Sequence, residues 1–144
     1  GGVAALVLCK LPRDAEGYMG RLRCVQEISA VTAACMMVKT SVFKAVGGFD
    51  EELKVAFNDI DLCMKVRKYG VKIVFTPYAE LYHYESKSRG MEDTPEKQLR
   101  FSREVNCFRR KWERELLKGD PYYNPNLTLN NTDCSLRKQE KNGD

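Results

Sequence analysis

Hydrophobic and polar positions follow several different spacings along the chain, and each spacing predicts a different element. Residues 31–39, VTAACMMVK, form an apolar run of strand length, which is typical of a strand buried on both faces. Residues 71–77, VKIVFTP, predict a strand that ends at Pro77, and residues 79–85, AELYHYE, predict another with alternating character. The stretch of residues 1–14 also suits a buried strand better than a signal peptide.

Helical spacing marks two shorter segments between these runs. Residues 41–46 predict a short helix that Thr40 or Ser41 caps and that Gly47 ends. A second helix is expected from Asn58 to residue 69, with basic residues in its later turns. Gly70 supplies the residue that closes it.

A third and longer helix is expected over residues 94–118. Thr94, Pro95 and Glu96 form a strong helix start, and apolar residues recur every three or four positions: Phe101, Val105, Phe108, Trp112 and Leu116. Four glutamates alternate with its basic residues, namely Glu96, Glu104, Glu113 and Glu115. This mixture predicts ion pairs on a solvent-exposed face rather than a surface that binds nucleic acid.

The order of these elements predicts an α/β fold, a mixed sheet with helices packed on it. The 144 residues amount to one domain, which we expect to bury about two thirds of its unfolded surface. We divide the chain into a main part, residues 1–93, the helix of residues 94–118, and an extended tail, residues 119–144.

Composition and charge narrow the classes of protein. No apolar run reaches the roughly 18–20 residues that a membrane span needs. The net charge of +4 permits an anionic partner without requiring one. The six cysteines include no C-x-x-C pair, which favours a reduced, cytosolic protein over a disulfide framework. Cys35 and Cys63 lie in apolar surroundings that suit buried thiols.

Two carboxylates, Asp59 and Asp61, stand at the start of the second helix. Acidic residues there bind free backbone N–H groups and oppose the helix dipole, which is sufficient to explain them. The alternative is a general base that faces a cleft beside the Gly-Gly-Phe turn.

His83 is the only histidine, so the chain has no histidine-rich zinc site. It is either a structural or surface residue, or one ligand of a metal whose other ligands are oxygens. The loop of residues 86–90, SKSRG, suits an oxyanion such as a diphosphate, and equally suits a solvated loop.

Several motifs in order resemble the C-terminal half of the family 2 glycosyltransferases of GT-A fold. They are an apolar strand followed by VFKAVGGFDEE, the acidic segment NDIDLC, a helix, then FTPY and YH, in residues 31–83. The later stretch FRRKWERELLKGDPYYNPNLTL resembles the end of bacterial members that modify cell-surface polysaccharide, including rhamnosyl-type transferases. The likeness covers roughly residues 17–137.

The resemblance implies transfer of a sugar from a nucleotide-diphosphate donor to a glycan or related hydroxyl acceptor, with inversion. Asp59 matches the family's general base, and Asn58 stands where the family has glutamate, which leaves it hydrogen bonding only. The residues that match the acceptor side are Gly47, Gly48, Phe49, Asn58 and Asp61, the last either structural or acceptor-orienting. His83 lies beside a metal-bound diphosphate in this comparison, with Ser88 and Arg89 on the diphosphate.

One feature departs from the family pattern. Family members bind the nucleotide and a Mg²⁺ or Mn²⁺ ion through an Asp-x-Asp motif in an N-terminal half, and no such motif ends an N-terminal strand here. We therefore expect an acceptor-side fragment that is inactive alone, from a cytoplasmic protein at the inner face of the membrane. The alternative is a non-catalytic module that binds glycan or another protein. Sugar, nucleotide, acceptor and oligomeric state are not specified by the sequence.

Overall fold

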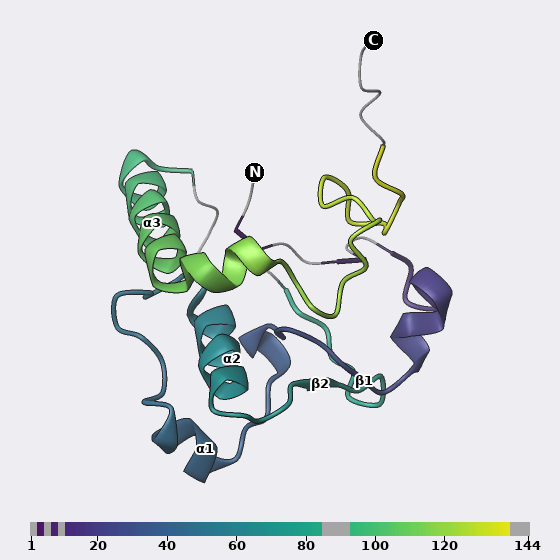
Figure 1. Ribbon diagram of the computed structural model, residues 1–144, viewed down its shortest axis with the longest axis horizontal. Helices are drawn as coiled ribbons and strands as arrows, with labels where there is room; N and C mark the ends of the chain where they lie inside the picture. The colour runs from purple at the N-terminus through teal and green to yellow at the C-terminus, as the bar shows by residue number, and fades with distance from the viewer. Residues whose placement is uncertain (1–2, 5–6, 9–10, 85–92, 139–144) are drawn as a thin grey trace.

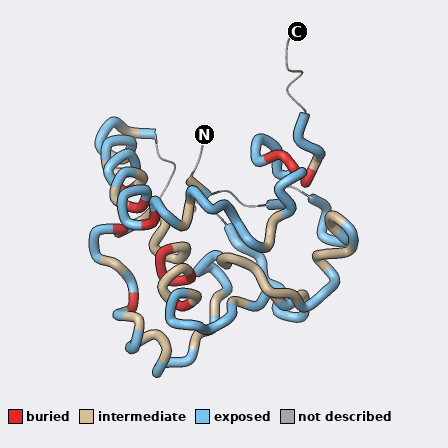
Figure 2. The backbone as a smooth tube through the Cα atoms, viewed as in Figure 1, coloured by how far each residue is buried: buried red, intermediate tan, exposed pale blue. Residues whose placement is uncertain are grey.

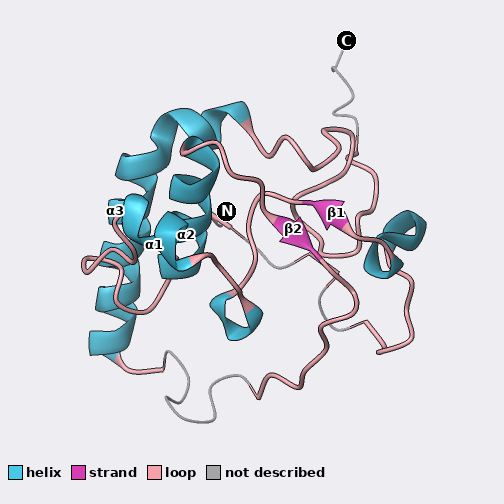
Figure 3. Ribbon diagram, turned by 90° about the horizontal axis from the view of Figure 1, so that it is seen from below, coloured by secondary structure: helices cyan, strands magenta, loops and turns pink. Residues whose placement is uncertain are grey.

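The computed structural model describes residues 3–4, 7–8, 11–84 and 93–138. Three α-helices lie together on one side of the molecule, and a small β-sheet lies on the other (Figure 1; Figure 3). With η for a 3-10 helix, the elements in chain order are η1 Tyr18–Arg23, β1 Gln26–Glu27, η2 Ala33–Cys35, α1 Thr40–Ala45, α2 Asn58–Lys68, β2 Val74–Phe75 and α3 Pro95–Lys118.

The sheet is much smaller than the sequence predicts. β1 and β2 pair antiparallel, with Gln26 opposite Phe75 and Glu27 opposite Val74. The strand expected at residues 71–77 is therefore confirmed over two residues only, and the one expected at residues 79–85 is wrong throughout its described part, residues 79–84. The chain is α/β, but a two-stranded sheet replaces the extended mixed sheet in the described residues.

Residues 31–39 do not form the predicted buried strand. They contain η2, and most of them are exposed to solvent, with the Met37 side chain fully so. A strand must pair its backbone N–H and C=O groups with neighbours, and the described residues offer this segment no partner strand. An apolar composition was therefore not sufficient to make it a strand. The described part of residues 1–14 also contains no strand, and half of Val7 is exposed.

The short helix α1 forms as predicted, although its start differs. Lys39 occupies the N-cap position and no side chain caps the helix, so the expected role of Thr40 or Ser41 is wrong. The end is as expected: Gly47 has a φ of 79°, in the left-handed region that favours glycine. The Gly48 N–H donates to the Phe43 carbonyl at 2.9 Å, which closes the last turn.

Helix α2 begins at Asn58 and is followed by Gly70, as the sequence predicts. Its N-cap residue, Phe57, adopts a left-handed backbone with a φ of 64° and caps no N–H with its side chain. A left-handed backbone is uncommon for a bulky residue, so the surrounding contacts must hold it there. The buried residues of α2 are Asp61, Leu62, Cys63 and Val66.

Helix α3 confirms the predicted start, length and end. The Thr94 hydroxyl accepts a hydrogen bond from the Lys97 N–H at 3.4 Å, and Gly119 follows the last turn with a φ of 76°. Of the predicted apolar stripe only Phe108 and Trp112 are buried, and Trp112 lies at a kink in the helix. The main core cluster consists of Leu53, Phe108 and Trp112, with flanking side chains from α2 and α3.

The tail is partly packed. Leu127 and Leu136 form an isolated antiparallel bridge, and Leu127 and Cys134 are buried. The Tyr122 hydroxyl donates to the Glu27 carboxylate at 3.1 Å, which ties the tail to β1. Residues 119–138 therefore belong to the folded part of the chain.

The chain exposes a large surface for its size. Its accessible area is 11472 Å², whereas a compact monomer of 16.5 kDa exposes roughly 7,600 Å². Buried positions are confined to short stretches, chiefly in α2 and α3 (Figure 2). The prediction that about two thirds of the unfolded surface would be buried is therefore wrong, since this area corresponds to about half.

Candidate functional site

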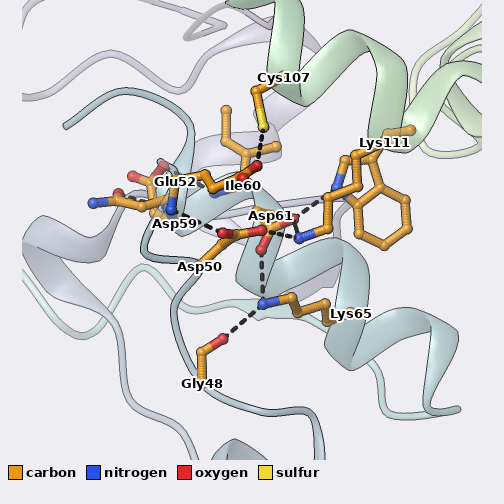
Figure 4. Close-up of polar contacts among 11 residues, drawn as sticks. Gly48, Asp50, Glu52, Asp59, Ile60, Asp61, Lys65, Cys107 and Lys111 are labelled. Carbon is orange, nitrogen blue, oxygen red and sulfur yellow. Dashed lines mark hydrogen bonds and ion pairs between the residues drawn. The ribbon is translucent and has the colours of Figure 1, made fainter. Parts of the chain in front are cut away.

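Asp61 is a completely buried carboxylate in the first turn of α2. The indole Nε1 of Trp112 donates to its Oδ1 at 2.8 Å. The Lys111 ammonium lies 2.7 Å from the same oxygen, and the Lys65 ammonium lies 2.9 Å from Oδ2. A buried charge is costly unless it is paired, and here cations approach both oxygens (Figure 4).

Each of these lysines has a second partner in the turn before α2. Lys65 Nζ donates to the Gly48 carbonyl at 2.9 Å, and Lys111 Nζ donates to the Asp50 carboxylate (Figure 4). Lysine has three N–H donors, so one ammonium can serve two acceptors. The turn of residues 47–50 is therefore fastened to α2 and α3 at two points.

The same contacts shift the ionisation of the groups involved. The Lys111 hydrogen bond, with a smaller effect from the Glu52 backbone N–H, lowers the pKa of Asp50 below its ordinary value. Burial acts to lower the pKa of Lys111, but Asp50 and Asp61 together outweigh that effect, and its pKa is raised. The ionised pair is thus the stable form at neutral pH.

Glu104 of α3 fixes the loop between this turn and α2. It is 3% exposed, and its carboxylate oxygens accept hydrogen bonds from the N–H groups of Val55 at 3.2 Å and Ala56 at 2.8 Å. Phe57 follows directly and packs on Phe108, with ring centroids 5.2 Å apart. These contacts hold the left-handed residue at the start of α2, and thereby the orientation of its first turn.

Asp59 lies in that first turn and is half-buried. Its Oδ2 accepts a hydrogen bond from the Ala33 N–H of η2 at 3.1 Å. The preceding residue, Asn58, keeps its side chain local, since its Oδ1 accepts from the Asp59 N–H at 2.7 Å. Asp59 therefore links α2 to η2. Its side chain is partly buried, and the rest of its surface stays accessible to solvent.

His83 lies elsewhere, in a wide, open groove of about 1170 Å³. Residues 32, 34 and 35 form part of its wall, next to Ala33, whose N–H binds Asp59. Exposed tyrosines, Tyr78 and Tyr82, line it too, beside an ion pair between Arg13 and Glu80 at 2.7 Å. The residues that line the groove do not include Asp59 or the turn of residues 47–50.

The described residues do not form a metal centre. Among them, no group of three or more histidine, cysteine or acidic side chains is placed to hold an ion. Asp61 and Asp50 already have ammonium partners in the positions where a cation would bind.

The structure brings together some of the sequence-predicted site residues and not others. Gly48 of the predicted Gly47–Phe49 turn is linked to Asp61 through Lys65, and Asp59 lies on the same helix as Asp61. His83 is exposed in the separate groove. The predicted diphosphate ligands Ser88 and Arg89 lie outside the described residues.

Two important residues were missed because the sequence placed them on a solvated helix face. Glu104 is buried, so its assignment to that face is wrong, and Lys111 is only 32% exposed and reaches inward to Asp61. A signal for Glu104 was present: it precedes Phe108 and Trp112 by four and eight residues, in register with the buried stripe.

Five cysteines in the described part of the chain are free, namely Cys24, Cys35, Cys63, Cys107 and Cys134. Cys63 is buried as predicted, whereas Cys35 is exposed, so that part of the prediction is wrong. No helix in the described part of the chain is both long and apolar enough to cross a membrane.

The chain is similar in sequence to several bacterial proteins. Over 137 residues, 94% of this chain, it is 54% identical to the uncharacterized protein y4gI of Sinorhizobium fredii. Over 115 residues, 80% of the chain, it is 39% identical to the O-antigen biosynthesis protein RfbC of Myxococcus xanthus. These stretches cover only 15% and 9% of those two relatives.

A third similarity is shorter. Over 62 residues, 43% of the chain, it is 36% identical to the N-acetylglucosaminyl-diphospho-decaprenol L-rhamnosyltransferase of Mycobacterium tuberculosis, of which the match covers 20%. No protein-family model matches the chain, and no solved structure does. The names of two relatives agree with the class of protein that the sequence motifs resemble.

Proposed function

We propose that this chain is the acceptor-side part of a longer glycosyltransferase that transfers a sugar, with inversion, to a hydroxyl of a cell-surface glycan or its lipid-linked precursor. The observation that carries the proposal is the position of Asp59. Its carboxylate is fixed at the start of α2 by the Ala33 N–H, in the first turn that α3 orients through Glu104. The relatives named for O-antigen biosynthesis and rhamnosyl transfer support the reaction class.

The chemistry assigned to Asp59 is general base catalysis. A sugar hydroxyl is a weak nucleophile at neutral pH, so its proton must pass to a base as the oxygen attacks the anomeric carbon. A half-buried carboxylate held by a backbone N–H is oriented and still accessible. Asp61, by contrast, is fully buried among its partners, which favours the structural role over direct contact with an acceptor.

The turn of residues 47–50 would shape the acceptor pocket, and Asn58 would orient the Asp59 backbone. His83, together with Ser88 and Arg89, would face the diphosphate of the donor. The nucleotide-sugar and a Mg²⁺ or Mn²⁺ ion would be held mainly by polypeptide outside these residues, because no Asp-x-Asp motif ends an N-terminal strand in this sequence. When bound, such an ion stabilises the charge on the departing diphosphate.

The surface of the chain supports its action as part of a larger protein. It exposes about one and a half times the area of a compact monomer of its mass. Large apolar side chains contribute to this surface, and further polypeptide would cover them: Met37, Val74, Tyr78 and Leu81 are each at least half exposed. We place the protein at the cytoplasmic face of the membrane, where it would meet a lipid-linked acceptor.

The proposal is tested by sugar transfer in a polypeptide that contains these residues together with the remainder of a relative such as y4gI. Purified protein would be supplied with Mn²⁺, a panel of nucleotide-sugars that includes an L-rhamnose donor, and an N-acetylglucosaminyl-diphospho-lipid acceptor. A glycosylated product detected by mass spectrometry supports the proposal. Calorimetry on the 144 residues alone should show no nucleotide-sugar binding. If the longer protein also binds none, the proposal is overturned.

The groove favours a second candidate, a non-catalytic glycan-binding module. Tyr78 and Tyr82 are 85% and 76% exposed at its wall, and tyrosine rings have both an apolar face and a polar tip. Binding of purified cell-surface polysaccharide to the 144-residue chain, lost in Tyr82→Ala, would support this reading. If no polysaccharide binds, glycosyl transfer remains the proposed function of the residues that line the groove.

A further inference from the structure

The buried carboxylate of Asp61 is the centre of a small charged network. Two ammonium groups, those of Lys65 and Lys111, lie within 2.9 Å and 2.7 Å of its oxygens. With Asp50 the network contains two positive and two negative charges, so its formal charges cancel. A compensated network of this kind has defined geometry, because the buried carboxylate of Asp61 must keep its partners.

The second contacts of the two lysines fall on either side of one residue. Lys65 binds the Gly48 carbonyl, and Lys111 binds the Asp50 carboxylate, so Phe49 lies between the two fastened positions. The Phe49 ring packs edge-on against Phe43, with centroids 5.5 Å apart and an interplanar angle of 72°. Even so, 48% of Phe49 remains exposed.

The Phe43 ring also restricts which residue can occupy the turn at position 48. A side chain at Gly48 would come within 3.0 Å of the Phe43 ring, and Gly48 has a φ of 64°. Only glycine fits this backbone and this contact without strain. The turn therefore packs against Phe43 on its inner side, and Lys65 and Lys111 bind the residues before and after Phe49. The Phe49 ring lies on the outer side of the turn.

We propose that Asp61, Lys65 and Lys111 are positioning residues that hold Phe49 as a rigid stacking surface for a sugar ring of the acceptor. This inference rests on the proposed function for the identity of the acceptor. A ring fixed before binding loses little conformational entropy when a ligand packs on it, so preorganisation increases affinity. Asp61 acts through the two lysines and does not itself touch the sugar.

The first test is the motion of the turn in the 144-residue chain. Lys65→Met removes the Gly48 contact and Lys111→Met removes the Asp50 contact, while each leaves Asp61 one ammonium and the Trp112 indole. Nitrogen-15 relaxation should show order parameters for residues 47–50 falling from about 0.85 towards 0.6 in both variants. Lys54→Met, an exposed neighbour, should leave them unchanged, and Lys65→Arg should restore most of the order. Unchanged order in both methionine variants overturns the positioning role.

The second test is sugar binding at Phe49, with free N-acetylglucosamine, L-rhamnose and D-glucose as probes. At least one should shift the amide resonances of residues 48–50, and Phe49→Ala should weaken that binding about tenfold or more, with Phe49→Tyr close to wild type. Lys65→Met and Lys111→Met should weaken it about threefold to tenfold. If no probe shifts these resonances, the stacking role is overturned. If sugar binds but the longer protein transfers none, the proposed function fails and the binding surface stands.

Discussion

The indole Nε1 of Trp112 donates a hydrogen bond of 2.8 Å to Oδ1 of Asp61, and this contact joins α3 to the first turn of α2. The two residues are 51 positions apart in the chain. Both are buried, and Trp112 belongs to the main core cluster with Leu53 and Phe108. One side chain thus contributes to the apolar core and to the stability of a buried carboxylate.

Trp112→Phe should destabilise the protein by about 1–3 kcal/mol, because it keeps an aromatic ring but removes the donor to a buried acceptor. Trp112→Ala should cost more, about 3–5 kcal/mol, since a large buried ring is lost as well. The measurement is urea unfolding followed by circular dichroism. Tryptophan fluorescence cannot be used, because Trp112 is the sole tryptophan and both variants remove it. Leu117→Ala, at a site 82% exposed on the same helix, is the control and should change stability by less than about 0.5 kcal/mol. Equal stability of Trp112→Phe and wild type would contradict the bond.

Glu104→Ala should free the loop before α2. The N–H groups of Val55 and Ala56 lose their acceptor, which should cost about 1–3 kcal/mol and speed amide exchange at both residues. Glu104→Gln keeps one carbonyl oxygen and should show a smaller effect. Hydrogen exchange detected by NMR measures both residues directly.

The matched control for Glu104 is Glu113→Ala, which removes an exposed glutamate from the same helix. It should leave exchange at Val55 and Ala56 as in the wild type. Slow exchange that persists in Glu104→Ala would show that the loop is held by other contacts.

Thiol labelling should proceed in two groups. Cys24 and Cys35 are exposed and should react quickly, whereas Cys63 and Cys134 are buried and should react only as the chain opens. Burial also raises the pKa of the Cys63 thiol, which lowers its thiolate fraction. Timed alkylation with peptide mapping gives the rate at each site. Rapid labelling of Cys63 in the folded chain would contradict the packing of α2.

Asp50 should make stability depend on pH in the acid range. Its carboxylate pKa is lowered in the folded state by the Lys111 hydrogen bond, from an ordinary value of 3.8. A lowered pKa contributes stability above the unfolded value, and that contribution is lost as the pH falls through the folded value. The difference in unfolding free energy between wild type and Asp50→Asn should therefore be constant above about pH 5 and shrink below about pH 4. A difference that grows on acidification would have the wrong sign.

Local signals in the sequence were sufficient for the helices. The Thr94, Pro95 and Glu96 start and the Gly119 end define α3, and Gly47 and Gly70 end the other two, because each supplies a backbone or capping group that acts within a few residues. The predicted strands had no such local determinant. Residues 31–39 have a strand's composition, yet a strand forms only where a neighbour accepts its backbone hydrogen bonds.

The residues of the candidate site were likewise only partly predictable from the sequence. The Gly-Gly-Phe turn and the acids at the start of α2 are visible in sequence because they are close together in the chain. The partners of Asp61 come from positions four, fifty and fifty-one residues away, and only the first is within helical reach. The inward direction of Lys111 depends on tertiary packing, so the roles of Asp61 as a buried centre and of Glu104 as a clamp emerged only with the fold.

The most direct measurement of the central claim is the turnover of Asp59→Asn in a longer protein that transfers sugar. Asparagine keeps the size of the side chain and an acceptor for the Ala33 N–H, but it cannot take a proton from the attacking hydroxyl. Transfer should fall by about 10²–10⁴-fold while nucleotide-sugar binding and the unfolding free energy stay close to wild type. Turnover close to wild type would contradict the assignment of Asp59 as the base.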